Sequence, residues 1–255
     1  MANSNRRKKG WLIGLIVLSV IIAIYLNRAY AHIYNVIGSA GLPAVNQSED
    51  YSVANNMSAT TSMTYVALGD SLTAGVGTNK PEESLPYLLA QKMAEQDKTV
   101  NLKNYAVPGF KSADLLVDLL PKAIKANPDV VTLLIGVNDI HNQVSEADFR
   151  RNYQLILDRL VKETKAKIYV INIPFIGADT MMLPPYDSYF QYRTEKFNQI
   201  IKELAQSRSL DYIDLYSPAV SLFQRSGDHY SLDLFHPSAA GYKIWADIIY
   251  DRINK

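Results

Sequence analysis

The sequence predicts an α/β domain built on a parallel β-sheet, and three observations support this. Short apolar segments alternate with longer amphipathic segments along residues 63–255. One short segment, Asp129–Gly136, is apolar almost throughout, which is typical of a central parallel strand covered on both faces. The chain has 255 residues, 48% hydrophobic and 20% charged, which suffices for one domain with a full core. Strands and helices that alternate in this way form right-handed βαβ units with helices on both faces.

The first segment, residues 1–34, has the composition of a membrane-directed sequence. Four basic residues at positions 6–9 precede an uncharged apolar run, Trp11–Leu26. Basic residues before such a run keep the N-terminus in the cytoplasm and place the rest of the chain outside. One interpretation is a single-pass signal anchor in the cell membrane. The other is a secreted protein, cleaved after Ala31 in the A-x-A-like site "AYA".

The length of the apolar run favours the anchor, because signal peptides usually have an apolar region of only ~7–15 residues. Residues 35–62 follow without periodicity and are rich in Ser, Asn, Ala and Thr, so we expect a flexible linker there. Residues 63–255 then form the α/β domain described next.

The strands of this domain are predicted from short apolar or alternating segments. In chain order they are Met63–Leu68, Thr99–Val107, Asp129–Gly136, Lys167–Pro174 and Asp211–Leu215.

The helices are predicted from amphipathic periodicity and from capping residues. Ser84 and Ser145 stand where N-cap residues are expected, and Pro121 should bend or break the helix that contains it. The helix that Ser145 caps has a clear apolar stripe. In chain order the helices are Ser84–Gln96, Lys111–Ala126, Ser145–Thr164, Tyr189–Ser207 and Ser238–Ile253.

Composition excludes several classes of function. The formal net charge of +1 gives no surface for nucleic acid. The absence of cysteine excludes disulfides, a thiolate nucleophile and cysteine-ligated zinc. The four histidines have no metal-ligand spacing, so we expect neither a metal nor another cofactor.

Polar residues follow three predicted strands and precede the last helix, at the edge where sites of parallel sheets lie. Ser71 could be a helix cap, and Asn138 or Gly109 could be turn residues. Together with "DLFHP" they indicate nucleophilic catalysis. A serine nucleophile needs a base at hydrogen-bond distance, and the base needs an acceptor. Asp233 and His236, three residues apart, can meet locally.

An oxyanion hole is also present in the pattern. The backbone N–H groups of Ser71 and Gly109 and the side-chain amide of Asn138 are three donors, and one donor can be worth about 3–4 kcal/mol in such a site. His229 is the rival base, but it lacks an aspartate three residues before it.

These four blocks, "GDSLT", the Gly109 segment, "GVND" and "DLFHP", resemble the ordered blocks of the GDSL, or SGNH, hydrolase family. Ser71, Gly109, Asn138 and His236 match its S, G, N and H. The resemblance implies a flavodoxin-like three-layer sandwich with a five-stranded parallel sheet. It also implies a Ser71–His236–Asp233 esterase or lipase with the oxyanion hole described above.

The substrate is less constrained than the chemistry. Met181, Met182, Leu183 and Tyr186 lie in a long connection after the fourth predicted strand. They either form an apolar wall for an acyl chain or pack under the sheet edge. Outside the membrane the candidate ester substrates are lipids such as lysophospholipids, short acyl esters and O-acylated glycans. An acyltransferase, an O-acetyl esterase of cell-wall glycans and a non-catalytic binding module are the alternative functions.

Overall fold

The computed structural model describes residues 2–42, 50–54, 61–94, 98–175, 177–178, 180–223 and 227–254. Its centre is a sheet of six strands in the order β1-β3-β2-β4-β5-β6. The strands are β1 (Asp50–Val53), β2 (Thr61–Gly69), β3 (Lys98–Asn104), β4 (Val130–Leu134), β5 (Lys167–Ile171) and β6 (Asp211–Ile213). Strands β2 to β6 are mutually parallel, as the alternation of strands and helices predicts.

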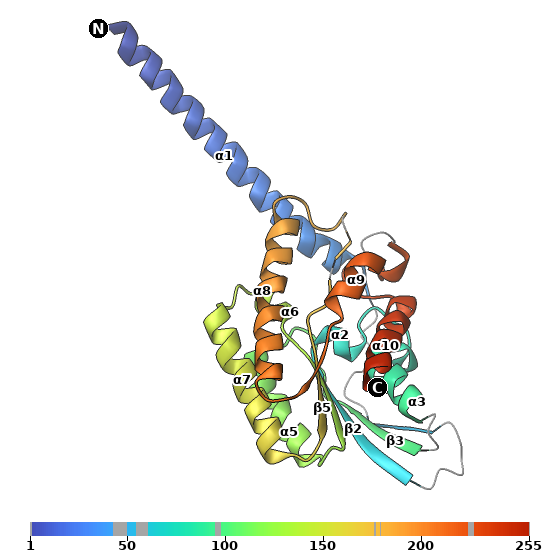
Figure 1. The fold of residues 1–255 in the computed structure, drawn as a ribbon. Coiled ribbons are helices and arrows are strands. Elements are labelled where there is room, and N and C mark those ends of the chain that lie inside the picture. The colour runs from blue at the N-terminus through green and yellow to red at the C-terminus, as the bar shows by residue number, and fades with distance from the viewer. Residues whose placement is uncertain are drawn as a thin grey trace.

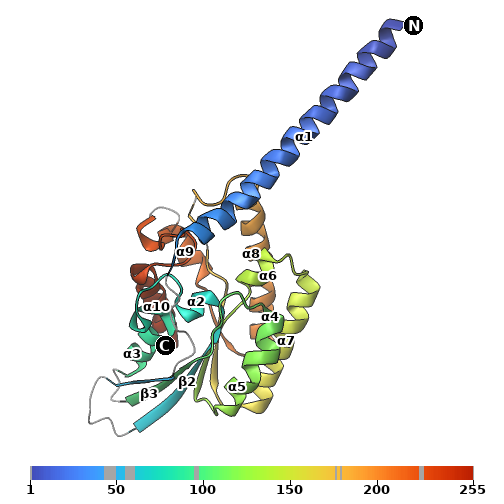
Figure 2. The same cartoon turned by 180° about the vertical axis from the view of Figure 1, so that it is seen from behind.

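Helices cover both faces of the sheet, which gives three layers (Figure 1). Helices α3 (Leu85–Ala94) and α10 (Ala239–Ile253) pack together on one face. Helices α5 (Leu120–Lys125), α7 (Glu146–Glu163) and α8 (Tyr186–Gln206) lie on the other face (Figure 2). Ser145 caps α7 by accepting a hydrogen bond from the Asp148 N–H, as predicted.

Short helices fill the remaining connections. They are α2 (Ser71–Ala74), the 3-10 turn η1 (Pro81–Glu83), α4 (Ser112–Asp114), the π-helical turn η2 (Leu115–Leu119), α6 (Val137–His141), α9 (Tyr216–Phe223) and the 3-10 turn η3 (Gly227–His229). The predicted irregularity near Pro121 is real. The π-helical turn precedes this proline, which stands in the first turn of α5, where its missing N–H costs no helical hydrogen bond.

Two sequence-based expectations are wrong. The sheet has six strands, because the segment Asp50–Val53 adds an antiparallel edge strand, β1, beside β3. This strand lies within the segment 35–62 that was expected to be a flexible linker. Val53 is buried in the core, and Asp50 pairs with Lys103 across the edge. The segment is polar and aperiodic, so only its pairing with a distant strand orders it; residues 43–49 and 55–60 lie outside the described residues.

The N-terminal helix α1 (Ala2–Ser39) is longer than predicted, since it continues through the first residues of the expected linker. By length and composition, its part from Lys8 to Ser39 is apolar and long enough to cross a membrane. Large apolar side chains from Trp11 to Ile24 are exposed, whereas Ala29 and Ile33 are buried against the domain. The helix projects from the end of the domain at which α2 and α6 lie (Figures 1 and 2).

Candidate active site

Ser71 stands at the junction of β2 and α2, at the carboxyl end of the sheet. Asp70 is the N-cap of α2, because its carboxylate accepts a hydrogen bond from the Leu72 N–H at 3.1 Å. The turn requires Gly69, since a Cβ there would overlap the Thr73 side chain and the Leu134 carbonyl oxygen. The glycine and the cap thus explain why an apolar strand ends in Gly-Asp-Ser and presents the serine at a helix N-terminus.

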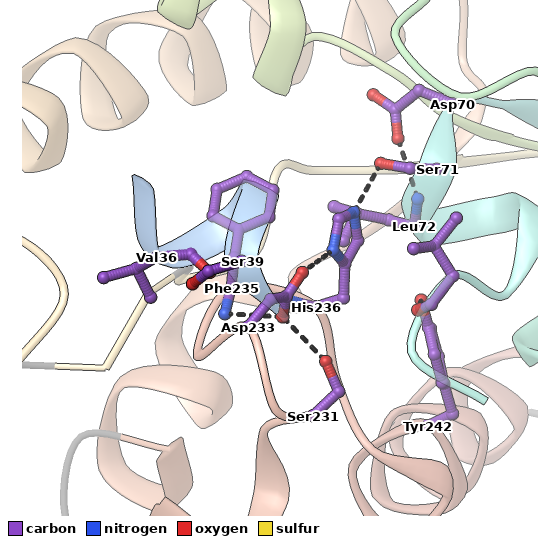
Figure 3. Close-up of polar contacts among 11 residues, drawn as sticks. Val36, Ser39, Asp70, Ser71, Leu72, Ser231, Asp233, Phe235, His236 and Tyr242 are labelled. Carbon is purple, nitrogen blue, oxygen red and sulfur yellow. Dashed lines mark hydrogen bonds and ion pairs between the residues drawn. The ribbon is translucent and has the colours of Figure 1, made fainter. Parts of the chain in front are cut away.

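His236 connects Ser71 to Asp233 by an unbroken series of hydrogen bonds (Figure 3). Its Nε2 lies 2.9 Å from Ser71 Oγ, and its Nδ1 lies 2.5 Å from Asp233 Oδ2. All three residues are buried: the exposed fraction of the surface is 7% for Ser71, 6% for His236 and 0% for Asp233. The pair that the sequence places three residues apart therefore meets a serine 165 positions earlier in the chain.

The carboxylate of Asp233 is held by four donors. Besides His236 Nδ1, its Oδ1 accepts hydrogen bonds from Ser231 Oγ at 2.7 Å and from the backbone N–H groups of Phe235 and His236. Burial by itself raises the pKa of Asp233, but the hydrogen bonds from His236 and Ser231 outweigh it and hold that pKa below its ordinary value. Asp233 is therefore an ionised acceptor that fixes the orientation of the imidazole ring.

Asn138, in α6, and Gly109, in the loop after β3, are linked to the segment of this serine through their neighbours. Asn138 Nδ2 donates to the Phe110 carbonyl oxygen at 3.1 Å and to Asp70 Oδ2 at 3.4 Å, so it bridges the neighbours of Gly109 and of Ser71. Gly109 has a φ of +82°, in the region that favours glycine, and the space beside its Cα is open. A small electron-rich group can thus approach the backbone there.

Two buried carboxyls next to the site received no role from the sequence. Asp70 is 1% exposed, and burial raises its pKa to about 7. Asp139 accepts hydrogen bonds from the backbone N–H and the hydroxyl of Ser112, and burial raises its pKa above the ordinary value. Their positions directly beside Ser71 and Asn138 were the only signal in the sequence.

The remaining histidines are not bonded to Ser71. His229, the rival base in the sequence, belongs to η3, and its backbone carbonyl accepts from the Ser238 N–H. His141 stands at the end of α6 with its ring against those of Phe190 and Phe235, at centroid distances of 4.6 and 5.4 Å. Burial lowers the pKa of His141 to about 4, so this ring is neutral and behaves as part of an apolar wall.

Two cavities adjoin this wall, and both have His141 and Phe190 in their lining. The first, here called the inner cavity, has a volume of about 150 Å³ and is lined by Val137, Ile140, His141, Met182, Phe190 and Tyr216, among others. The second, here called the junction groove, has a volume of about 400 Å³ and lies between α1 and α8. Its lining includes Leu26, Tyr30, His141, Tyr186, Tyr189 and Phe190.

The four residues of the predicted acyl wall separate into different positions. Met182 lines the inner cavity, and Tyr186 lines the junction groove. Met181 is fully buried and Leu183 is exposed, and neither belongs to the lining of these two cavities. This connection therefore both lines cavities and packs into the core, and its contact with an acyl chain stays a prediction. Within the described ranges of the chain, no group of three metal-ligating side chains is found.

Comparison with known proteins gives a consistent family. A model described as GDSL-like lipase/acylhydrolase family matches residues 67–244. The uncharacterized protein YpmR of Bacillus subtilis is 26% identical over 216 residues, which cover 74% of this chain and 80% of that protein. The spore germination lipase LipC of Bacillus licheniformis is 24% identical over 204 residues, 72% of this chain and 92% of that protein.

A solved structure shares the fold. The acetylxylan esterase Axe2 of Geobacillus stearothermophilus superposes with a TM-score of 0.61 at 18% identity. The superposition covers 78% of this chain and 97% of the esterase chain. The site described above therefore lies within a matched fold and within the matched part of the sequence.

Proposed function

The chain belongs to the GDSL-like lipase/acylhydrolase family and is a carboxylic ester hydrolase, and we propose that Ser71, His236 and Asp233 are its catalytic triad. The observation that carries this proposal is the series of hydrogen bonds from Ser71 Oγ through both nitrogens of His236 to Asp233. A serine with a base on its hydroxyl, and an acceptor on the other nitrogen of that base, is an activated nucleophile.

The reaction proceeds in two halves. Ser71 Oγ attacks the ester carbonyl carbon while its proton passes to His236 Nε2, and the carbonyl oxygen becomes an oxyanion. Collapse of this intermediate breaks the bond to the alcohol, which leaves with the proton from His236. Water then attacks the acyl-serine, gives its proton to His236, and a second collapse releases the carboxylic acid and returns the proton to Ser71.

Asp233 stabilises the imidazolium that forms in each half, and its low pKa keeps it ionised throughout. The backbone N–H groups of Ser71 and Gly109 and the amide of Asn138 are the donors assigned to the oxyanion. Asn138 would exchange the Phe110 carbonyl for the substrate oxygen, which costs it one hydrogen bond and gains a charge-assisted one.

We further propose that α1 stays attached as a membrane anchor, with the domain on the extracytoplasmic side. Support comes from its docked half, since Ala29 and Ile33 are buried and the Tyr186 hydroxyl donates to the Leu26 carbonyl oxygen at 3.2 Å. Cleavage after Ala31 would remove Leu26 and Ala29 from these contacts. The anchor helix is therefore packed against the domain and is not a separate leader segment.

Hydrolysis of p-nitrophenyl esters by the full chain in detergent tests the proposed function, with Ser71→Ala as the variant. We expect loss of turnover by about 10³-fold or more in Ser71→Ala, because the nucleophile is removed. A fluorophosphonate should label the wild type and leave the variant unlabelled. Full activity in Ser71→Ala would reject the triad.

Ser217→Ala is the matched control. Ser217 is an exposed serine of α9, and its hydroxyl donates to Asp214 Oδ2. Turnover and labelling in this variant should equal those of the wild type. A loss of both in Ser217→Ala as well as in Ser71→Ala would mean that the assay responds to general damage.

A further inference from the structure

The junction groove is formed partly by the helix that the sequence marks as membrane-spanning. Leu26 and Tyr30 of α1 form one side, and Tyr186, Tyr189 and Phe190 of α8 form the other. Three hydrogen bonds join α1 to the start of α8 and to the connection before it. The Tyr25 hydroxyl donates to the Pro184 carbonyl oxygen, and the Tyr186 hydroxyl donates to the Leu26 carbonyl oxygen. His32 Nε2 bonds with the Thr180 carbonyl oxygen.

The position of this groove along α1 coincides with the end of a membrane span. A hydrocarbon core of about 30 Å needs about 20 helical residues. Counted from Gly10, just after the basic residues, such a span ends near Ala29. Leu26 and Tyr30 flank this point, and tyrosine is enriched where a span meets water. The groove therefore opens at the level at which lipid ester groups are found.

A continuous aromatic wall leads from the groove to the catalytic histidine. The ring of Tyr30 lies 5.3 Å from that of Tyr186, which lies 6.4 Å from Phe190. His141 lies 4.6 Å from Phe190 and 5.4 Å from Phe235. Phe235 in turn lies 4.9 Å from the ring of His236.

The inner cavity lies along the same wall, because it shares His141 and Phe190 with the groove. It is also lined by Val137, the neighbour of Asn138 in α6. The pKa of His141, which burial lowers to about 4, leaves this ring uncharged at neutral pH. The two side chains that both cavities share, His141 and Phe190, are thus uncharged, whereas the lining of the inner cavity also includes the carboxyl of Asp187.

On this basis, and resting on the proposed esterase function, we propose that the junction groove binds the acyl chain of a membrane lipid ester. The chain enters from the bilayer between α1 and α8, follows the aromatic wall and presents its carbonyl to Ser71. The anchor helix thus forms part of the substrate site and does not act only as a tether. A volume of about 400 Å³ lies within the ~300–1,000 Å³ range of small-molecule sites.

The first test compares Tyr189→Glu with Tyr192→Glu in the full chain reconstituted in phosphatidylcholine vesicles. Both tyrosines are exposed on α8, but Tyr189 lines the groove and Tyr192 lies outside its lining. The readout is the ratio of kcat/KM for p-nitrophenyl dodecanoate to that for the acetate. We expect Tyr189→Glu to lower this ratio about tenfold or more, because the alkyl chain would lie against a carboxylate.

Tyr192→Glu should leave the ratio at the wild-type value. An unchanged ratio in Tyr189→Glu, or an equal fall in both variants, overturns the assignment of the groove. If p-nitrophenyl acetate is hydrolysed and Tyr189→Glu leaves the ratio unchanged, the protein is a short-acyl or glycan esterase. The proposed function then holds and the groove assignment fails.

The second test measures binding without turnover. The Ser71→Ala full chain is mixed with a palmitoyl lysophosphatidylcholine whose acyl chain carries a diazirine, and the crosslinked peptides are identified after illumination. We expect crosslinks in the first turns of α8 and in α1 near Leu26. These crosslinks should be lost in the double variant that carries Tyr189→Glu in addition to Ser71→Ala. Crosslinks confined to other surfaces overturn the proposal. If these crosslinks form but the wild type hydrolyses no ester, the proposed function fails and the groove assignment stands.

Discussion

At the scale of single residues, two buried aspartates near Ser71 differ because their donors differ. Asp233 has four donors, and its pKa lies below the ordinary value despite burial. Asp70 has two, the Leu72 N–H and the amide of Asn138, and burial raises its pKa to about 7. The carboxyl of Asp233 is thus suited to stabilise a cation, whereas ionisation of the Asp70 carboxyl costs free energy.

Asp70→Asn should change how stability depends on pH. A folded-state pKa of about 7, against an ordinary pKa of 3.8, means that the folded protein binds the proton more tightly than the unfolded chain. This contribution to stability is complete below the unfolded pKa and is lost as pH rises through about 7. We therefore expect the fall in Tm between about pH 5 and pH 8 to be smaller in Asp70→Asn.

Thermal unfolding of both proteins at the two pH values measures this difference. The asparagine keeps a carbonyl oxygen that can accept from the Leu72 N–H, so the cap of α2 remains. An identical change of Tm in wild type and variant would mean that Asp70 does not titrate in this range.

At the scale of elements, α1 changes its role along its length. The part from Trp11 to Ile24 exposes large apolar side chains, such as Ile21 at 57% exposure, whereas Ile33 is fully buried in the core. The turns that contain Ala29 and Ile33 therefore pack against the domain. β1 is a second addition to the alternating βαβ units, since this short strand pairs with β3 and forms one edge of the sheet.

Ile33→Ala should destabilise the domain by about 2–5 kcal/mol, because it removes buried methyl and methylene groups and leaves a cavity. Ile21→Ala is the matched control on the same helix, and we expect little change there. The measurement is thermal or denaturant unfolding of the full chain in detergent micelles. Equal effects of the two substitutions would contradict the docking of α1.

At the scale of the whole molecule, the carboxyl end of the sheet and the departure of α1 are on the same side (Figure 1). The carboxyl end carries Ser71, so an anchored chain would hold its active site toward the membrane and not away from it. This arrangement depends on α1 remaining attached.

The mature protein should therefore retain residues 1–31 and remain in the membrane fraction. The contacts that Leu26 and Ala29 make with the folded domain require an uncleaved α1. Intact mass and N-terminal sequencing of protein from membranes measure this directly. A mature N-terminus at His32 would contradict the anchor and would leave the junction groove without one of its walls.

Much of this protein follows from local sequence alone. The parallel sheet, its main helices and the capping of α7 follow from periodicity and from residues whose preferences act over one or two turns. The serine, the histidine and its aspartate, and the oxyanion donors were predicted because parallel strands bring their carboxyl ends to one edge. The family assignment followed from the same blocks.

Other features were decided only by the tertiary structure, because they depend on contacts between residues far apart in the chain. The segment Asp50–Val53 becomes a strand only because β3 offers it a free edge, and its own composition favours a linker. Burial, which no local pattern reports, sets the pKa of Asp70 and of His141. The docking of Leu26 and Tyr30 beside α8 makes the junction groove, and it joins residues about 160 positions apart through packing and not through sequence.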